Sequence, residues 1–251
     1  MTPPALRLEA VDAGYRAFRA LFGVDLEVPA GAAVALVGAN GAGKSTVARV
    51  ATGLVRPTAG RVVVDGVDLT GAPVHRFARA GIASAPEGRS VFATLSVEDN
   101  LRLAFRNDPG VADDRAALRE ALGLFPRLDD RRGQLAGTLS GGEQRMLTLA
   151  RVLVLKPRLL VADELSLGLA PLVTAEVYRT LEQVRAAGCA LLVVEQHLDH
   201  ALALADQVVV IRKGEIAFTG TPEEARALGD HILLPPGNPA GQAARAEGAV
   251  G

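Results

Sequence analysis

Hydrophobic and polar positions follow two different periods along the chain. Short, mainly aliphatic runs of four to six residues have the length of buried strands, and they predict core strands at 33–37 (AVALV), 82–85, 159–163 and 190–195. Between them apolar residues recur at helical spacing, which predicts helices at about 44–54, 97–107, 114–123, 142–155, 171–187 and 222–228. Strands that alternate with helices indicate an α/β protein with a mainly parallel sheet.

The remaining regions differ from this alternation. The first 30 residues and the stretch 61–69 (RVVVDGVDL), with its Asp-Gly turn, predict an antiparallel β portion. Residues 95–140 are mostly helical and lie between two core strands, which predicts an inserted helical subdomain. From 235 to 251 (PPGNPAGQAARAEGAVG) almost no large apolar residue occurs, so we expect a disordered tail after a single domain spanning residues 1–234.

Composition narrows the function classes. Of the 251 residues 49% are hydrophobic, which suits a globular protein with a sizeable core, and the net charge of −1 gives no electrostatic footprint for nucleic acid. The single cysteine, Cys189, lies in an apolar run and is expected in the core. The start MTPPALRLEA lacks the basic and apolar regions of a signal peptide, and no run of about 18 apolar residues occurs. We therefore expect a chain that does not itself cross a membrane.

A glycine-rich stretch follows the first core strand. GANGAGKST, residues 38–46, matches the phosphate-loop pattern G-x-x-x-x-G-K-[ST]. Glycines allow successive backbone N–H groups to form an anion nest, and the helix that begins at Lys44 adds its positive dipole end. Lys44 would reach the β- and γ-phosphates, and the hydroxyl of Ser45 would ligate Mg²⁺. The predicted nucleotide-binding residues here are Gly38, Ala39, Asn40, Gly41, Ala42, Gly43, Lys44, Ser45 and Thr46.

Two adjacent carboxylates end the apolar run at 159–163. In LLVADE, Asp163 would orient Mg²⁺, and Glu164 would polarise the attacking water as a general base. An acidic pair at a helix start and a glycosidase-like carboxylate pair are the alternatives. Because adjacent strand residues point to opposite faces, two acids acting across one sugar bond are disfavoured.

A third motif lies between these two. In TLSGGEQRMLTLARVL, residues 138–153, Ser140 and Glu143 have capping-box spacing, which alone predicts a well-capped helix with an apolar face. Together, GANGAGKST, LSGGEQ and LLVADE resemble an ABC-type ATP-binding cassette, in the family's order and over residues 6–228. The resemblance implies a P-loop ATPase that uses ATP and Mg²⁺.

The resemblance also implies roles for residues outside the phosphate loop. Tyr15 lies where the family places an aromatic that stacks on adenine, although a core tyrosine of an edge strand is the alternative. In such cassettes two subunits pack head to tail, so Ser140, Gly141 and Gly142 would bind the γ-phosphate held by the partner's phosphate loop. Hydrolysis would then be linked to closure of the dimer, and closure to movement of a partner.

Two positions near the nucleotide depart from the general cassette pattern. Glu87, in the loop after a predicted core strand, replaces the usual glutamine and would bring only acceptor oxygens to the metal and the nucleotide. Gln196 occupies the switch position, where the family has histidine, and would donate to the γ-phosphate; His197 could act there only in a shifted register. A metal site formed by Glu195, His197 and His200 has weak spacing and is disfavoured.

The stretches PEGR, SLGLAP and VEQ indicate a subgroup of the family. They resemble the second ATPase subunit of branched-chain amino acid importers, although Leu165 stands where that subgroup has proline, and Ala170 replaces the general cassette's aspartate. The resemblance implies a peripheral subunit at the cytoplasmic face of the plasma membrane. It would pair with a homologous ATPase or a second copy, two transmembrane permeases and, indirectly, a periplasmic binding protein.

Three alternatives differ in cargo or in function class. An importer ATPase for another small amide or amino-acid-like solute is the nearest. A soluble cassette ATPase acting on DNA or ribosomes is disfavoured, because no sustained heptads separate Thr46 from Leu139 and only one cassette is present. A nucleotide-binding regulator without turnover is disfavoured because Lys44 and Glu164 are both present.

Overall fold

The computed structural model describes residues 2–16, 18–86, 90–106, 111, 113–196 and 198–228. In this part of the chain the strands are β1 (Leu6–Tyr15), β2 (Phe18–Val28), β3 (Ala33–Val37), β4 (Ala59–Val64), β5 (Val67–Asp68), β6 (Ile82–Ala85), β7 (Leu159–Asp163), β8 (Ala190–Glu195), β9 (Gln207–Arg212) and β10 (Glu215–Gly220). The helices are α1 (Lys44–Ala51), α2 (Val74–Arg79), α3 (Val97–Phe105), α4 (Asp114–Leu124), α5 (Pro126–Asp129), the 3-10 helix η1 (Ala136–Thr138), α6 (Gly141–Leu153), α7 (Pro171–Ala186), α8 (Leu198–Leu204) and α9 (Pro222–Leu228).

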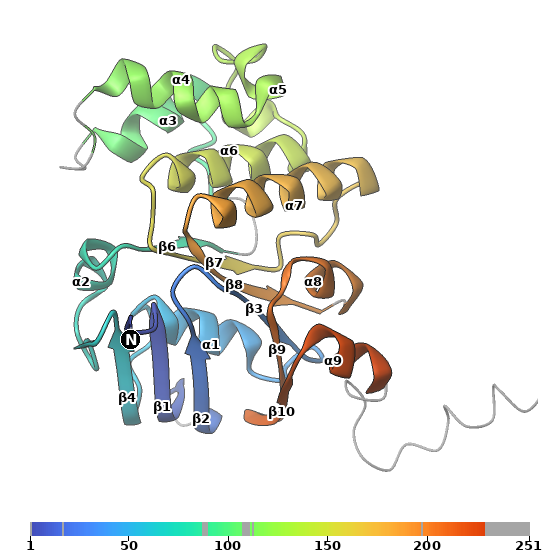
Figure 1. The fold of residues 1–251 in the computed structure, drawn as a ribbon. Coiled ribbons are helices and arrows are strands. Elements are labelled where there is room, and N and C mark those ends of the chain that lie inside the picture. Colours follow the sequence, from blue (N-terminus) through green and yellow to red (C-terminus); the bar gives the residue numbers. More distant parts are fainter. Residues whose placement is uncertain are drawn as a thin grey trace, which may run out of the picture.

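The strands form two sheets (Figure 1). The larger sheet has the order β10-β9-β3-β8-β7-β6, and its strands run parallel except for β10, which is antiparallel to β9. The smaller sheet, β2-β1-β4-β5, is antiparallel throughout. Every residue of β3, β7 and β8 is buried, which explains why these strands are continuous apolar runs in the sequence. The predicted α/β architecture with an antiparallel N-terminal portion is thus confirmed.

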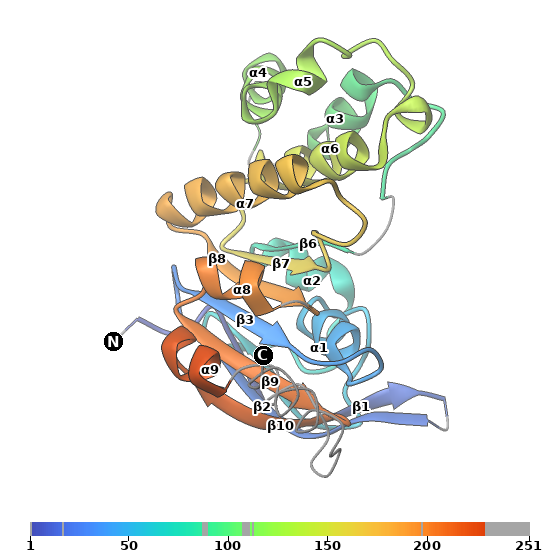
Figure 2. The ribbon, with the colours of Figure 1, turned by 90° about the vertical axis from the view of Figure 1, so that its right-hand side faces the viewer.

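Helix α1 lies between the two sheets and contacts both of them. Its side chains Val47 and Val50 are fully buried in a cluster with residues of β1 and β2 on one side and of β3 and β8 on the other. The helix ends at Ala51 rather than at the predicted residue 54, because Gly53 turns the chain with a φ of 73°. The loop that connects β3 to α1 therefore lies where the larger sheet meets the helix (Figure 2).

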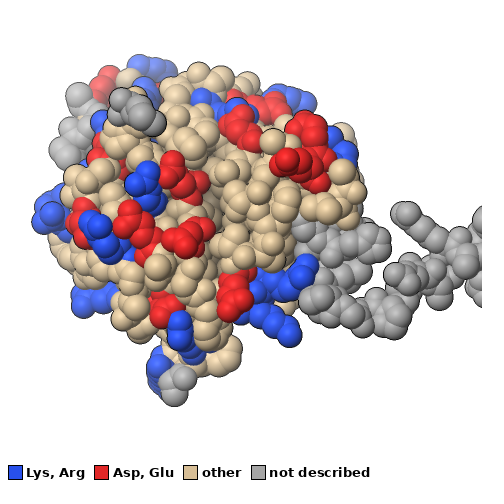
Figure 3. Space-filling model, turned by 60° about the horizontal axis from the view of Figure 1, so that its bottom comes forward, with Lys and Arg blue, Asp and Glu red and all other residues tan. Residues whose placement is uncertain are grey.

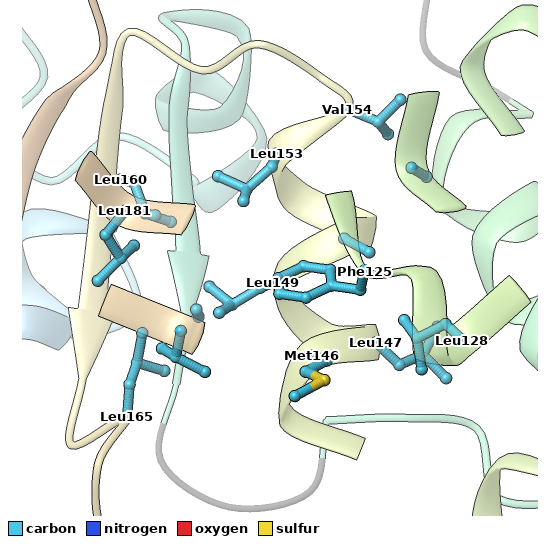
Figure 4. Packing of buried hydrophobic residues seen from close by; sticks show 14 of the residues in the cluster. Phe125, Leu128, Met146, Leu147, Leu149, Leu153, Val154, Leu160, Leu165 and Leu181 are labelled. Atoms are coloured by element: carbon cyan, nitrogen blue, oxygen red, sulfur yellow. The ribbon is translucent and has the colours of Figure 1, made fainter. Parts of the chain in front are cut away.

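Helices α6 and α7 cover the other face of the larger sheet, and α3, α4 and α5 lie on α6 (Figure 1). Figure 4 shows Phe125, from the start of α5, pointing at Met146 and Leu149 of α6. These side chains are fully buried, and burial of each contributes about 2 kcal/mol to the free energy of unfolding. The elements α3 to η1 fall within the predicted subdomain at 95–140; its division from the rest of the chain stays a prediction, and the predicted tail lies outside the described residues.

Leu165 is buried in the same cluster. Its side chain is 1% exposed and belongs to the same cluster as Leu160 of β7 and Leu181 of α7 (Figure 4). The departure from proline therefore has a packing explanation, because the residue after the acidic pair is a core residue that fills space between the sheet and α7.

Candidate functional site

The phosphate loop, the acidic pair and the predicted switch position Gln196 meet at the carboxyl ends of the larger sheet's strands, because the strands that precede them, β3, β7 and β8, are consecutive in the sheet and parallel. Val37 at the end of β3 pairs with Glu195 at the end of β8. Asp163 at the end of β7 pairs with Val194 of the same strand β8. The phosphate loop after β3, the acidic pair and Gln196 are therefore neighbours at the carboxyl ends of the strands, where open α/β sheets bind ligands.

Glycines shape the loop between β3 and α1. Gly43 has a φ of 111°, which L side chains rarely adopt, and a β-carbon there would lie 3.0 Å from Leu21 Cδ2. At Gly38 a β-carbon would overlap the carbonyl oxygen of Ile211. The absence of a side chain at these two positions lets the loop pack directly against β2 and β9.

Lys44 begins α1, and its side chain turns back over the loop. Its Nζ donates to the carbonyl oxygens of Gly38 at 2.9 Å and Ala39 at 3.3 Å. The same Nζ lies 3.3 Å from Oε1 of Glu164, and the lysine is only 4% exposed. The structure thus brings the predicted phosphate-binding lysine and the predicted general base into direct contact.

The acidic pair lies where β7 ends. Asp163 is the last residue of the strand, Glu164 follows it, and the two are 6% and 8% exposed. Glu164 has a φ of 48°, a left-handed conformation that is uncommon for a residue other than glycine. Its N–H donates to the carbonyl oxygen of Val194 at 2.8 Å. Strain of this kind persists where surrounding contacts impose it, and it is concentrated at functional sites.

A pocket of about 310 Å³ connects the phosphate loop with the β1–β2 hairpin. It is lined by Tyr15, Phe18, Ala20, Asn40, Gly41, Gly43, Lys44, Ser45, Thr46 and Glu164. All of these residues except Phe18 and Ala20 belong to the predicted site. Of the other loop residues, Gly38, Ala39 and Ala42 lie outside the lining, as does Asp163.

Two aromatic side chains stand at the hairpin end of this pocket. Tyr15 is 39% exposed, so it is not a core residue, and its hydroxyl accepts a hydrogen bond of 2.9 Å from Arg49 of α1. The Arg49 guanidinium also lies over the tyrosine ring, 5.7 Å from its centroid. Phe18 pairs with Tyr15 across the hairpin. Sequence reasoning missed Phe18 and Arg49. For Phe18 a signal was available, because Tyr15 and Phe18 are two aromatic residues separated by only two positions, as in a tight hairpin.

Ser140, Gly141 and Gly142 lie apart from this pocket. The predicted capping box is present: the Ser140 hydroxyl accepts from the Glu143 N–H at 3.3 Å, and Glu143 Oε2 accepts from the Ser140 N–H at 2.8 Å. Burial raises the pKa of Glu143, but the hydrogen bonds from Ser140 and the charge of Arg131 outweigh burial and hold that pKa below its ordinary value. Helix α6 lies on the opposite side of the larger sheet from α1 (Figure 1), and none of the three residues lines the pocket.

A larger hollow of about 560 Å³ lies between α5 and the start of α6. Its lining consists of Arg127, Asp130, Arg131, Gln134 and Glu143. The arginines are already paired, since Arg131 Nε lies 2.8 Å from Glu143 and Arg127 Nε lies 3.7 Å from Glu176. The hollow has no glycine loop or lysine, so volume alone does not make it the candidate site.

Other predicted residues have separate outcomes. Gln196 is half-buried and directly follows β8, whereas Glu87 and His197 lie outside the described residues. Within the described residues no group of three histidine, cysteine, aspartate or glutamate side chains could hold a metal ion; this does not test the disfavoured site with His197, which lies outside them. Cys189 is buried as expected, and burial raises the pKa of its thiol to about 11.

The surface and the helices add two general observations. Acidic and basic side chains are interspersed on the face shown in Figure 3, without a continuous area of either charge. In the part of the chain that the structure describes, no helix has both the length and the apolar character needed to cross a bilayer.

Comparisons with known proteins agree with this geometry. The chain is 42% identical over 217 residues to the high-affinity branched-chain amino acid transport ATP-binding protein BraG of Pseudomonas aeruginosa, covering 86% of this chain and 92% of that protein. It is 36% identical to the probable branched-chain amino acid transport ATP-binding protein LivF of Archaeoglobus fulgidus, covering 87% and 93%. The lipopolysaccharide export system ATP-binding protein LptB of Escherichia coli K12 is 32% identical, with 84% and 88% covered.

Solved structures share the fold. The ATP-binding subunit of an ABC transporter superposes with a TM-score of 0.80 at 27% identity, covering 92% of this chain and 95% of that chain. An ATP-binding cassette in its ADP conformation gives a TM-score of 0.78 at 27% identity, covering 90% and 94%. The sequence pattern of the ABC transporter family matches residues 21–166, which is more than half of the chain. This chain therefore belongs to the ABC transporter family, as one of its ATP-binding cassettes.

Proposed function

We propose that this chain is the ATP-hydrolysing subunit of an ABC importer that takes up branched-chain amino acids. The observation that carries the proposal is the pocket in which the phosphate loop, Lys44 and Glu164 meet, in a chain 42% identical to BraG. An importer of another small amide or amino-acid-like solute is the alternative. The lower identity to LptB, at 32%, favours an amino-acid importer over an export system.

The phosphate loop binds the nucleotide in this proposal. Its backbone N–H groups and the start of α1 attract the phosphates, and the residues involved are Gly38, Ala39, Asn40, Gly41, Ala42, Gly43, Lys44, Ser45 and Thr46. Lys44 contacts the β- and γ-phosphates. Tyr15 stacks on adenine, and Phe18, across the hairpin, adds a second apolar surface for the base.

Two residues supply oxygen ligands that Mg²⁺ prefers. Ser45, which carries a hydroxyl, lines the pocket, and Asp163, which carries a carboxylate, ends β7, with β8 between β7 and β3; hydroxyl and carboxylate oxygens fit the ion. Bound Mg²⁺ would neutralise charge on the phosphate oxygens. The predicted contribution of Glu87 stays a prediction.

Glu164 acts as the general base in the proposed reaction. Its contact with Lys44 sets the carboxylate beside the place where the γ-phosphate would be held, and the burial of Glu164 limits the freedom of its side chain. From there it accepts a proton from the attacking water while Lys44 stabilises the phosphate charge. Gln196, which leaves the neighbouring strand β8, donates to the γ-phosphate.

A second cassette completes the site. Because α6 lies across the larger sheet from α1, Ser140, Gly141 and Gly142 are available to the γ-phosphate bound by a partner cassette, as the head-to-tail dimer requires. At the exposed start of α6, the backbone N–H groups of the first turn and the positive dipole end of the helix would serve that purpose. The partner is a homologous ATPase or a second copy, and the pair works with two permeases and a periplasmic binding protein at the cytoplasmic face of the membrane.

Glu164→Gln tests the general base. We expect phosphate release to fall by at least about 100-fold, the usual contribution of a general base, while nucleotide binding persists and ATP traps a dimer. Phosphate release, fluorescent-nucleotide titration and light scattering measure these three quantities. Turnover close to wild type would contradict the assignment.

The switch position is tested by a pair of variants. We expect Gln196→Ala to lower turnover by about tenfold or more and His197→Ala to leave it near wild type, because only the former removes the proposed donor. Loss of turnover in His197→Ala alone would show that the register is wrong.

The cargo is tested in cells that lack this chain. We expect wild type, but not Glu164→Gln, to restore uptake of radiolabelled leucine, isoleucine and valine, with lysine uptake as the control. Restored uptake of a different solute would retain the ATPase function and reject the proposed cargo.

A further inference from the structure

A buried carboxylate beside the proposed catalytic site has no role in the function proposed above. Glu195, the last residue of β8, is 2% exposed. Its Oε2 accepts from the Ser166 hydroxyl at 2.9 Å, and its Oε1 accepts from the Ser166 N–H at 3.2 Å and from the Tyr178 hydroxyl at 2.9 Å. Within the described part of the chain it forms no ion pair.

These hydrogen bonds join three separate elements. Ser166 lies in the turn after β7, 29 positions before Glu195, and Tyr178 lies on α7, 17 positions before it. A buried carboxylate without a cation loses several kcal/mol of hydration and depends on its donors to compensate. Displacement of the turn would remove both Ser166 donors at once, so Glu195 strongly resists such movement.

The turn in question contains Glu164. Each of its first three residues has its own anchor: the Glu164 N–H donates to Val194, the Leu165 side chain is buried in the core, and Ser166 binds Glu195. Two of these anchors belong to β8, which continues directly into Gln196. Glu195 is therefore connected to both residues that would act on the water and the γ-phosphate.

We propose that Glu195 is a positioning residue that holds the turn 164–166 against β8, so that Glu164 and Gln196 keep their relative placement during hydrolysis. The Ser166 and Tyr178 hydroxyls complete the network. Burial, together with the charge of Glu195, raises the pKa of Tyr178 far above its ordinary value, so this hydroxyl remains a donor at physiological pH. This role rests on the proposed ATPase function, and it would make Glu195 one of the residues that determine the rate of ATP hydrolysis.

Kinetics of the full-length chain test the role. We expect Glu195→Ala to lower kcat about 100-fold, the effect of a misplacement of about 1 Å, with the KM for ATP within about threefold of wild type. Ser166→Ala and Tyr178→Phe each remove one donor and are expected to lower kcat about fivefold. Glu195→Gln is expected to stay within about threefold of wild type, because its amide oxygen still accepts at Oε1 and its NH₂ can donate to Ser166 Oγ.

A matched control separates this role from general stability. Thr180 is another buried hydroxyl on α7, 3% exposed, but it donates only within its own helix, to the Glu176 carbonyl at 3.0 Å. We expect Thr180→Val to leave kcat within about twofold of wild type. A similar loss of kcat in Thr180→Val, or a kcat near wild type in Glu195→Ala, would overturn the proposal.

Hydrogen exchange provides a measurement that does not depend on turnover. We expect the peptide covering 164–170 to exchange at least about tenfold faster in Glu195→Ala than in wild type or Thr180→Val, because the anchor of Ser166 is lost. Unchanged exchange would reject the network. If the wild type failed to hydrolyse ATP in the presence of its partner subunits, the proposed function would fail, while this exchange result would still decide whether Glu195 holds the turn.

Discussion

The loop after β3 and the turn after β7 face each other across the Lys44–Glu164 contact, yet they reach their unusual backbone conformations in different ways. In the loop, Gly43 has a positive φ of 111°. In the turn, Glu164 has a positive φ of 48° although it carries a side chain. The loop uses a residue that tolerates the conformation, whereas the turn imposes it through a hydrogen bond to Val194, the burial of Leu165 and the binding of Ser166 to Glu195.

This difference determines which changes each segment can tolerate. A loop built on glycine is strained when a β-carbon is added at a position with positive φ, and more so where a neighbouring side chain already lies close. The turn instead depends on its contacts with the rest of the protein. Removing one of those contacts should disturb it even when Glu164, the residue with the positive φ, is unchanged. Three substitutions test this difference between the loop and the turn, in order of decreasing expected effect on the free energy of unfolding.

Leu165→Ala removes an anchor of the turn. We expect the free energy of unfolding to fall by about 3 kcal/mol, because a fully buried leucine leaves a cavity, and kcat to fall about tenfold because Glu164 loses support. Urea unfolding and phosphate release measure the two effects. Leu181→Ala, in the same cluster, is the control: it should destabilise the fold similarly but change kcat less than about twofold. Equal losses of kcat would mean that the turn has no special dependence on Leu165.

Gly43→Ala adds a β-carbon to the loop. We expect a loss of about 2 kcal/mol in the free energy of unfolding and at least tenfold weaker binding of fluorescent ADP, because both φ and the contact with Leu21 oppose the side chain. Gly71→Ala is the control, since Gly71 also has a positive φ, 69°, but no neighbouring atom within 4 Å. Gly71→Ala should lower the free energy of unfolding by about 1 kcal/mol and leave the affinity for ADP within about twofold of wild type. Normal ADP binding by Gly43→Ala would argue against the glycine requirement.

Ala170→Ser adds a cap where the turn enters α7. Ala170 is the N-cap residue, makes no side-chain cap hydrogen bond and precedes Pro171. A serine hydroxyl could accept from an unpaired N–H of the first turn, so we expect a gain of about 0.5–1 kcal/mol in urea unfolding. Ala187→Ser, at the other end of the helix, should give no gain. A gain from both substitutions, or from neither, would reject the capping explanation.

Sequence patterns predicted the strands at 33–37, 82–85, 159–163 and 190–195 with the bounds that the structure has. For 33–37, 159–163 and 190–195 they succeeded because a parallel strand covered on both faces is a mainly apolar run; β6, at the edge of the sheet, is half-buried at its two central residues. The predicted starts of α3 and α4, residues 97 and 114, also match, and the structure shows Ser96 and Asp113 capping these helices through local hydrogen bonds. Helix α2 escaped prediction because it has only six residues and Phe77 alone is buried.

Most residues of the pocket could be predicted because the phosphate loop is contiguous in sequence. The contacts of Ser166 with Glu195, and of Tyr15 with Arg49, could not, because they depend on strand register and on the packing of α1 under the hairpin. Leu165 illustrates the same limit. From the sequence alone it is an unexplained departure from proline, and only its burial in the cluster with Leu160 and Leu181 identifies it as part of the core.

The hydrogen bond between Arg49 and Tyr15 links the two ends of the proposed nucleotide site through one helix. Lys44 begins α1 and Arg49 lies in its last turn, so the phosphate end and the base end of the proposed site are attached to one rigid rod. The five positions from Lys44 to Arg49 advance about 7.5 Å along the helix axis, and a helix keeps this spacing when neighbouring elements shift. In the proposed ATPase, this helix would therefore keep Tyr15, the proposed adenine-binding residue, at a fixed separation from Lys44, the proposed phosphate-binding residue.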